Sequence, residues 1–181
     1  IIFTSGGTEA NNLAIRGLLE SQNKHGKHII TSAIEHSAVK NVCEALEKRG
    51  YEVTYLPVYE DGIVKIEDVK AAIREDTVLI TIMTANNEIG TIQAVAHWAE
   101  RAHAAGAMLL CDAVQGYGRV GVPDSCDLVA LSAHKVHGPK GIGALWCRDG
   151  ARPATLLHGG DQEGGRSGTL SPALCAGFGA A

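Results

Sequence analysis

Val78-Leu79-Ile80-Thr81-Ile82-Met83 is a short apolar run rich in β-branched residues, and an amphipathic stretch from Gln93 to Ala105 follows it. Runs of four to eight such residues are typical of strands buried on both faces of a sheet. The same order of strand and helix occurs twice before it, at His28 to Thr31 with Ser37 to Arg49 and at Glu52 to Leu56 with Ile66 to Arg74. This order predicts βαβ units and therefore a mostly parallel sheet covered by helices.

Three more apolar runs follow with shorter connections, at Ala107 to Cys111, Leu128 to Ser132 and Ile142 to Cys147. We therefore expect one three-layer α/β/α domain over residues 1–181, since this length supports one core but not two large ones. The chain opens without Met inside an expected strand and stops inside an expected helix, so we expect both ends to be truncated.

Composition narrows the classes of function. The chain has 16 Lys and Arg residues and 20 Asp and Glu residues, which gives a net charge of -4. This charge does not favour binding to nucleic acid or to an anionic membrane. Five scattered cysteines without C-x-x-C spacing indicate neither a disulfide framework nor a zinc knuckle. They fit a reducing compartment, so we expect the cytoplasm or an organellar matrix. The apolar runs are far shorter than the roughly 20 residues of a membrane helix.

Polar residues follow the expected strands, at the edge where parallel sheets bind ligands. The first strand ends in Thr4-Ser5-Gly6-Gly7-Thr8 and leads into a helix, which is either a phosphate-binding start of a helix or a glycine turn with Thr8 as N-cap. The second strand is followed by His36, which could act as an acid, a base, an aromatic stacking partner or a structural residue.

Two later strands deliver the most reactive candidates. Asp112, with Gln115 three residues on, is either a helix N-cap or a buried carboxylate that keeps a pyridine nitrogen protonated. Lys135, in Ser132-Ala133-His134-Lys135, is either a solvated surface charge or an amine that forms a Schiff base. A phosphate cradle, a stacking ring, an acid and an amine together are what pyridoxal phosphate requires.

A metal site is the competing hypothesis for the same segment, because His134 and His137 have a spacing that can place two ligands on one helical face. No H-E-x-x-H motif or nearby third ligand accompanies them. Lys135 between them and Pro139 after them favour a turn over a helix, so we expect no metal.

Seven segments resemble the cysteine desulfurases of the NifS and IscS type, which belong to the class V aminotransferases within the fold-type I pyridoxal-phosphate enzymes. The resemblance spans the whole chain and is carried by Thr4 to Asn12, Glu35-His36, Asn86 to Gly90, Asp112 to Gln115, Ser132 to Lys135, Gly138 to Gly141, and Arg166 to Thr169. It implies the large, cofactor-binding domain of such an enzyme, without the N-terminal segment and the C-terminal small domain that supplies an arginine for the substrate carboxylate.

The resemblance also implies roles around the cofactor ring. Lys135 would bond to the cofactor aldehyde, Asp112 would pair with the pyridinium nitrogen, and His36 would stack on the ring. Gln115 and Asn87 would contact the phenolate side.

Further implied roles concern the phosphate, which Gly7, Thr8, Ser132 and His134 would hold. In family dimers the threonine at the position of Thr169 reaches the phosphate of the other subunit, which implies a homodimer. The preceding segment, residues 160–166, is one residue shorter than the usual form, so this contact is the least supported part of the resemblance.

The implied reaction removes sulfur from L-cysteine, gives L-alanine and a persulfide on the enzyme, and supplies a sulfur-acceptor or scaffold protein for iron-sulfur cluster assembly. Lys135 would move the Cα proton, and His36 would carry a proton. None of the five cysteines matches the nucleophilic cysteine of the family; Cys175 lies in an apolar run that we expect to be a buried helix. The chain is therefore expected to be inactive alone. Two alternatives stay open: a selenocysteine lyase or another class V enzyme, and a non-catalytic cofactor-binding fragment.

Overall fold

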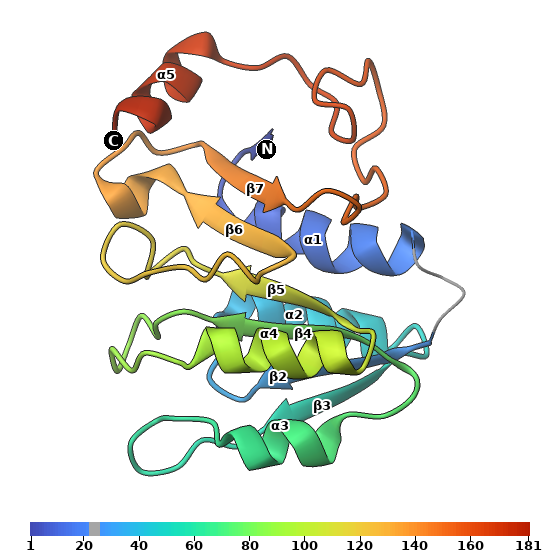
Figure 1. The fold of residues 1–181 in the computed structure, drawn as a ribbon. Helices are drawn as coiled ribbons and strands as arrows, with labels where there is room; N and C mark the ends of the chain where they lie inside the picture. The colour runs from blue at the N-terminus through green and yellow to red at the C-terminus, as the bar shows by residue number, and fades with distance from the viewer. Residues whose placement is uncertain (22–25) are drawn as a thin grey trace.

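The structure, a computed structural model, describes residues 1–21 and 26–181. The described residues form a seven-stranded sheet in the order β1-β7-β6-β5-β4-β2-β3 (Figure 1). Its strands are β1 (Ile2–Thr4), β2 (His28–Ser32), β3 (Glu52–Leu56), β4 (Thr77–Met83), β5 (Met108–Asp112), β6 (Leu128–Ser132) and β7 (Gly143–Cys147). Only β7 runs against the others, pairing antiparallel with β1 and β6, so the predicted mostly parallel sheet is confirmed.

Helices cover both faces of this sheet. They are α1 (Gly7–Ser21), α2 (Ser37–Glu47), α3 (Ile66–Ala72), α4 (Val95–Ala104) and α5 (Pro172–Ala180), with a short 3-10 helix, η1 (Ala133–Val136). In Figure 1, α3 and α4 lie in front of the sheet, and α1 and α2 lie behind it. The predicted three layers are therefore confirmed, and the ends of the predicted strands and helices differ from the observed ones by at most two residues.

The two cores follow from the alternation of side chains along each strand. In β4, Leu79 packs in the core beneath α1 and α2, whereas Ile80 and Ile82 pack on the opposite face, in the core beneath α3 and α4. Successive side chains of a strand point to opposite faces, so a run that is apolar throughout must be covered on both sides. This is why the continuous apolar run at 78–83, rather than an alternating one, predicts a central strand.

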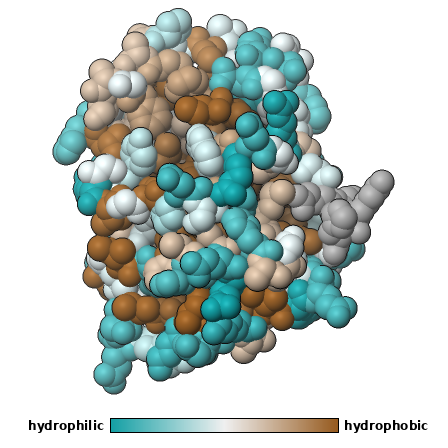
Figure 2. All heavy atoms as spheres, viewed as in Figure 1, coloured by the Kyte–Doolittle hydropathy of each residue, from teal (hydrophilic) through white to brown (hydrophobic). Residues whose placement is uncertain are grey.

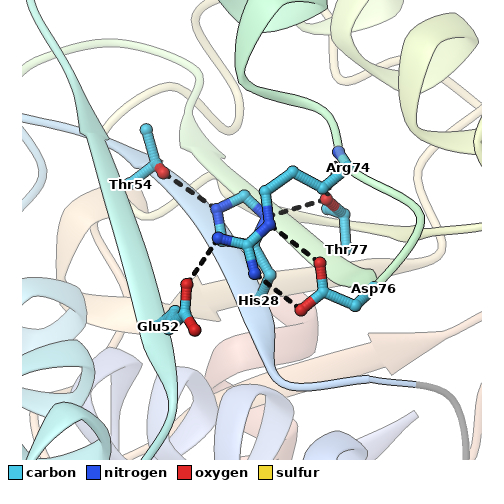
Figure 3. A network of polar contacts seen from close by, with 6 residues as sticks. All are labelled: His28, Glu52, Thr54, Arg74, Asp76 and Thr77. Atoms are coloured by element: carbon cyan, nitrogen blue, oxygen red, sulfur yellow. Dashed lines mark hydrogen bonds and ion pairs between the residues drawn. The ribbon is translucent and has the colours of Figure 1, made fainter.

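A polar network of buried and exposed side chains lies at the amino-terminal edge of the sheet (Figure 3). The His28 ring bridges two hydroxyl groups, with Nδ1 2.7 Å from Thr77 Oγ1 and Nε2 2.8 Å from Thr54 Oγ1. Arg74 beside it pairs with Asp76 at 2.7 Å. Burial and the nearby Arg74 charge lower the pKa of His28, so its ring stays neutral at physiological pH. These contacts fix β2, β3 and β4 at the edge opposite their carboxyl ends.

Helix α5 corrects one prediction. The segment around Cys175 is helical as expected, but no residue of α5 is buried, and Cys175 is half-buried. Figure 2 shows apolar side chains gathered on the surface where α5 lies, at the upper left. The helix approaches the rest of the described chain near Gly138 and Pro139, which leaves its apolar side chains at most half-buried. Composition alone predicts burial but not which neighbours are present.

Candidate active site

One pocket lies at the carboxyl edge of the sheet, where the ends of β2, β4, β5 and β6 meet the start of α1. It encloses about 570 Å³, part of which is open to solvent. Its lining residues are Gly7, Thr8, Asn11, His36, Ala38, Met83, Ala85, Asn87, Asp112, Val114, Gln115, Ser132, His134 and Lys135. Nine of the ten site residues proposed from the sequence are in this set, and Thr169 is not. Their roles stay predictions.

The start of α1 provides the first wall. The helix begins at Gly7, so Thr8 is its second residue and not the N-cap that the alternative interpretation requires. The first amides of a helix have no partner within it and point outward, here into the pocket. A Cβ on Gly7 would lie 2.7 Å from Val114 Cγ2 and 3.5 Å from Ser132 Cβ, so the close approach of these walls requires glycine.

Asp112 ends β5 and is 4% exposed. Its Oδ2 accepts a hydrogen bond from Asn11 Nδ2 at 2.8 Å, and its Oδ1 accepts one from Val114 N at 3.0 Å. Burial raises the pKa of the Asp112 carboxyl, although these hydrogen bonds and the nearby His36 act in the opposite direction. A cationic or N–H partner in the pocket would therefore stabilise the charged form of Asp112.

Lys135 lies in η1, directly after β6, in the turn that Pro139 favours over a longer helix. His137 follows in a left-handed backbone conformation with φ 67°, and the amide of Gly138 bonds back to Ala133 O at 2.9 Å. Arg119 Nη1 donates to Lys135 O at 2.8 Å, which holds the turn from outside. The backbone around the lysine is thus fixed on two sides, with the side chain at the pocket.

His36 caps α2, because its Nδ1 accepts the amide of Ala38 at 3.1 Å. A backbone N–H can only donate, so Nδ1 contributes its lone pair and the proton of the neutral ring lies on Nε2. His36 therefore presents an N–H donor to the pocket. Taking up a second proton on Nδ1 would release the Ala38 amide and remove the cap.

Three residues that the sequence analysis left without a role also build the site. Asn11 lines the pocket and holds Asp112, and Arg119 holds the Lys135 turn. Glu35 is buried, and its Oε1 accepts hydrogen bonds from Ser32 Oγ at 2.6 Å and Met83 N at 3.1 Å, which joins the ends of β2 and β4. Asn11 and Glu35 both lie in segments that carry the resemblance, and Asn11 also lies one helical turn after Gly7 and so shares its face. Arg119 had no sequence signal.

Glu35 gives a prediction for stability. Burial raises its pKa to about 8, with the Asp112 charge adding to the effect, from an ordinary value of 4.5. The folded chain therefore holds a proton that the unfolded chain releases, so folding is weakened progressively as pH rises from 4.5 to about 8. We expect Glu35→Gln to raise the free energy of unfolding of the cofactor-free protein by about 3 kcal/mol at pH 7 and by nothing near pH 4.5. Urea unfolding at several pH values measures this.

The control for this prediction is Glu44→Gln, which changes an exposed carboxylate on α2. It should leave the free energy of unfolding unchanged within about 0.5 kcal/mol at every pH. A gain in Glu35→Gln that is the same at pH 4.5 and pH 8 would contradict a buried, protonated Glu35.

The cysteines lie elsewhere. None of the five lines the pocket, and Cys43, Cys111 and Cys126 are buried. Burial raises the pKa of Cys43 to about 12 and that of Cys147 to about 11, so both remain thiols at neutral pH. Within residues 1–21 and 26–181, no cluster of three or more His, Cys, Asp or Glu side chains could hold a metal ion. No helix in these ranges is long and apolar enough to cross a membrane.

The model of the aminotransferase class-V family matches residues 1–171. The chain belongs to this family. Among curated relatives of the family, the cysteine desulfurase IscS of Dictyoglomus turgidum is 49% identical over 185 residues, which cover 100% of this chain and 47% of the relative. The chain thus spans about half the length of the curated relatives it matches.

Two solved structures of similar fold agree with the family assignment. One, described as SspA in complex with cysteine, has a TM-score of 0.94 and 42% identity and covers 99% of this chain and 53% of its own. The other, a NifS-like protein, has a TM-score of 0.93 and 39% identity and covers 98% of this chain and 50% of its own. These identities fit the resemblance stated from the seven sequence segments.

Proposed function

We propose that residues 1–181 are the pyridoxal-phosphate-binding large domain of a cysteine desulfurase. The observation that carries the proposal is the shared pocket of the Lys135 amine, the Asp112 carboxylate and the helix start at Gly7 and Thr8. An amine, an acid and an anion site within one hollow match the aldehyde, the pyridine nitrogen and the phosphate of this cofactor. The relatives that are named cysteine desulfurases support the choice of reaction.

The phosphate end fits the first wall of the pocket. The unpaired amides at the start of α1 and the side chain of Thr8 can donate to phosphate oxygens, and the helix dipole favours a negative charge there. Ser132 Oγ and His134 Nδ1 lie 3.0 Å apart on the facing wall. The glycine at position 7 leaves room that a side chain would fill.

The ring end fits two buried amides as well as Asp112. Within the described residues, Asn11 Oδ1 and Gln115 Oε1 are buried without a hydrogen-bond partner. Unpartnered buried polar atoms are costly, and at a pocket wall they indicate a missing ligand. Because an amide can be turned about its last bond, Gln115 can offer either an acceptor or a donor to the ring oxygen. Asn87 lies exposed at the pocket mouth and would reach the same side.

When bound, the cofactor would supply an electron sink for the bond electrons of the substrate Cα. The protein would do the rest. Asp112 would keep the pyridine nitrogen protonated, and Lys135 would bond to the cofactor aldehyde at rest and then move the proton at the substrate Cα. His36 would stack on the ring and donate from Nε2. Its cap bond to Ala38 argues against a free proton carrier at Nδ1.

We propose L-cysteine as the substrate, and one structural relative is described as a complex with cysteine. A protein thiolate would bond to the substrate sulfur as the C–S bond breaks, leaving L-alanine and a protein persulfide. Since none of the five cysteines lines the pocket, that thiolate would come from the part of the full-length protein that this chain does not span. We further propose that the protein is a homodimer in which Thr169 reaches the site of the other subunit. Its sulfur would pass to an acceptor protein for iron-sulfur cluster assembly in the cytoplasm.

The test is an assay of the purified full-length protein with L-cysteine and a thiol reductant. We expect alanine and sulfide in equal amounts, and cofactor binding but no sulfide release by residues 1–181 alone. Transamination without sulfide would overturn the desulfurase proposal in favour of another class V reaction. Activity confined to selenocysteine would favour a lyase, and a full-length protein that binds the cofactor without any turnover would favour a binding module.

A further inference from the structure

The segment of residues 157–169, between β7 and α5, has no helix or strand but is closed by its own hydrogen bonds. Ser167 N donates to Leu157 O at 3.1 Å, Asp161 N donates to Ser167 Oγ at 3.1 Å, and Gly168 N donates to Gln162 Oε1 at 2.8 Å. Figure 1 shows it as the orange-red segment that arches over the N-terminal end of the chain. Such a loop holds a shape of its own and can present a residue at a fixed place.

Two acidic side chains attach this 157–169 loop to the start of the chain. Glu163 Oε2 accepts the amide of Phe3 in β1 at 2.9 Å. Arg166 donates to both oxygens of Glu9, with Nε 2.8 Å from Oε1 and Nη2 3.2 Å from Oε2. Glu9 Oε2 also accepts the amide of Ser5 at 2.7 Å. The stronger of the two attachments is the two-pronged one between Arg166 and Glu9.

The Glu9–Arg166 pair is well shielded, with side-chain exposures of 19% and 16%. Burial raises the pKa of Glu9, but the hydrogen bonds from Arg166 and Ser5 outweigh it, so that pKa is lowered and the carboxylate stays charged. Removing one partner of such a pair leaves the other charge buried and uncompensated. The pair is therefore a fixed joint and not a transient surface contact.

The position of this joint does not fit a role in the pocket of its own chain. Glu9 directly follows Thr8 in α1, yet neither Glu9 nor Arg166 lines the pocket. Thr169, three residues after Arg166, is exposed and also outside the pocket. Neither the Glu9–Arg166 pair nor Thr169 therefore contributes to the pocket of its own chain.

We propose that the Glu9–Arg166 ion pair positions the 157–169 loop so that the Thr169 hydroxyl reaches the cofactor phosphate of a second copy of the chain. The proposal rests on the homodimer of the proposed function. It makes Glu9, which adjoins the phosphate cradle of its own subunit, a positioning residue for the site of the other subunit. The two sites of the dimer are then joined through one salt bridge each.

Mixed dimers of the full-length protein test this assignment, because only one of the two sites can hold cofactor covalently. One subunit carries Lys135→Ala, and Glu9→Gln is placed either in that subunit or in the loaded one. We expect cofactor to dissociate about tenfold faster when Glu9→Gln is in the Lys135→Ala subunit, in line with the loss of one charged hydrogen bond. Placement in the loaded subunit should change the rate less than twofold.

Further variants serve as controls for the joint itself. Arg166→Met should reproduce the effect of Glu9→Gln in the same placement, and the double variant should be no worse than either, because both break one interaction. Glu100→Gln, which changes a carboxylate on α4 that is 66% exposed, should leave the rate unchanged in both placements.

Hydrogen exchange of the cofactor-free dimer gives a readout that does not depend on the loaded enzyme. The amides of Ser167 and Gly168 should exchange at least about tenfold faster in Glu9→Gln, since the loop loses its main attachment. A faster loss from the subunit that itself carries Glu9→Gln, unchanged exchange in the loop, or a monomeric full-length protein would each overturn the proposal. Covalent attachment at Lys135, measured in the same samples, tests the proposed function separately.

Discussion

Replacing Lys135 by alanine is expected to abolish covalent attachment of pyridoxal phosphate and to lower sulfide release from L-cysteine by at least about 10³-fold. Lys135 is the lysine that lines the pocket, and its turn is fixed by the Arg119 contact and by the left-handed His137. No other side chain of the pocket can replace its amine. The full-length protein, incubated with cofactor, reduced with borohydride and mapped by peptide mass spectrometry, should carry the label at Lys135 and none in the variant.

The matched control is Lys140→Ala, which removes an exposed lysine from the same glycine-rich turn and outside the pocket. It should keep the absorbance band of the bound cofactor and the activity within about twofold. A label that maps to Lys140, or a Lys135→Ala protein that still shows the band, would refute the assignment.

Asp112→Asn is expected to lower activity by about 10² to 10³-fold, which corresponds to roughly 3–4 kcal/mol for the loss of a buried charged partner. Asparagine keeps the shape and the contact with Asn11 but cannot keep a pyridine nitrogen protonated. The variant should still be labelled at Lys135, because the aldehyde and the lysine are unchanged. Activity assays and labelling of the same samples separate these two effects.

The same substitution should act in the opposite direction on the stability of the cofactor-free protein. Burial raises the pKa of Asp112, so the folded chain holds a proton that the unfolded chain releases above its ordinary value of 3.8. The folded state of the native sequence therefore becomes less stable as pH rises above 3.8, and the stability advantage of Asp112→Asn should grow with pH. Asp149→Asn, at an exposed position, is the control for both measurements. A stability loss in Asp112→Asn that grows with pH would contradict a strained, buried carboxyl.

Opposite effects on activity and stability would identify Asp112 as a residue kept for function at a cost to the fold. Glu35 is also buried, and its carboxyl joins two strand ends, so Glu35→Gln tests structure where Asp112→Asn tests chemistry. The Asp112 charge adds to the rise in the pKa of Glu35. Ionising both carboxyls is therefore costly, and Asp112 is the one that a cofactor cation would stabilise.

Sequence patterns determined the sheet, the helices and most of the pocket. A strand with apolar side chains on both faces, such as β4, predicts burial on both faces, and in a parallel sheet the carboxyl ends of the strands lie at one edge. Polar residues at the ends of different strands, such as His36, Asp112 and Lys135, are therefore expected to lie close together, and this expectation requires no measured distance. The family resemblance added their roles, which the pocket supports and experiments must test.

Only the tertiary structure decided which side chains touch across long stretches of sequence. Asn11 reaches Asp112 and Arg166 reaches Glu9, and no local period links residues so far apart. The state of a group likewise depends on its surroundings: the raised pKa of Glu35 comes from burial, and the ring proton of His36 is set by the amide of Ala38. Periodicity fixes which face a residue occupies, whereas contact and desolvation arise only when elements pack together.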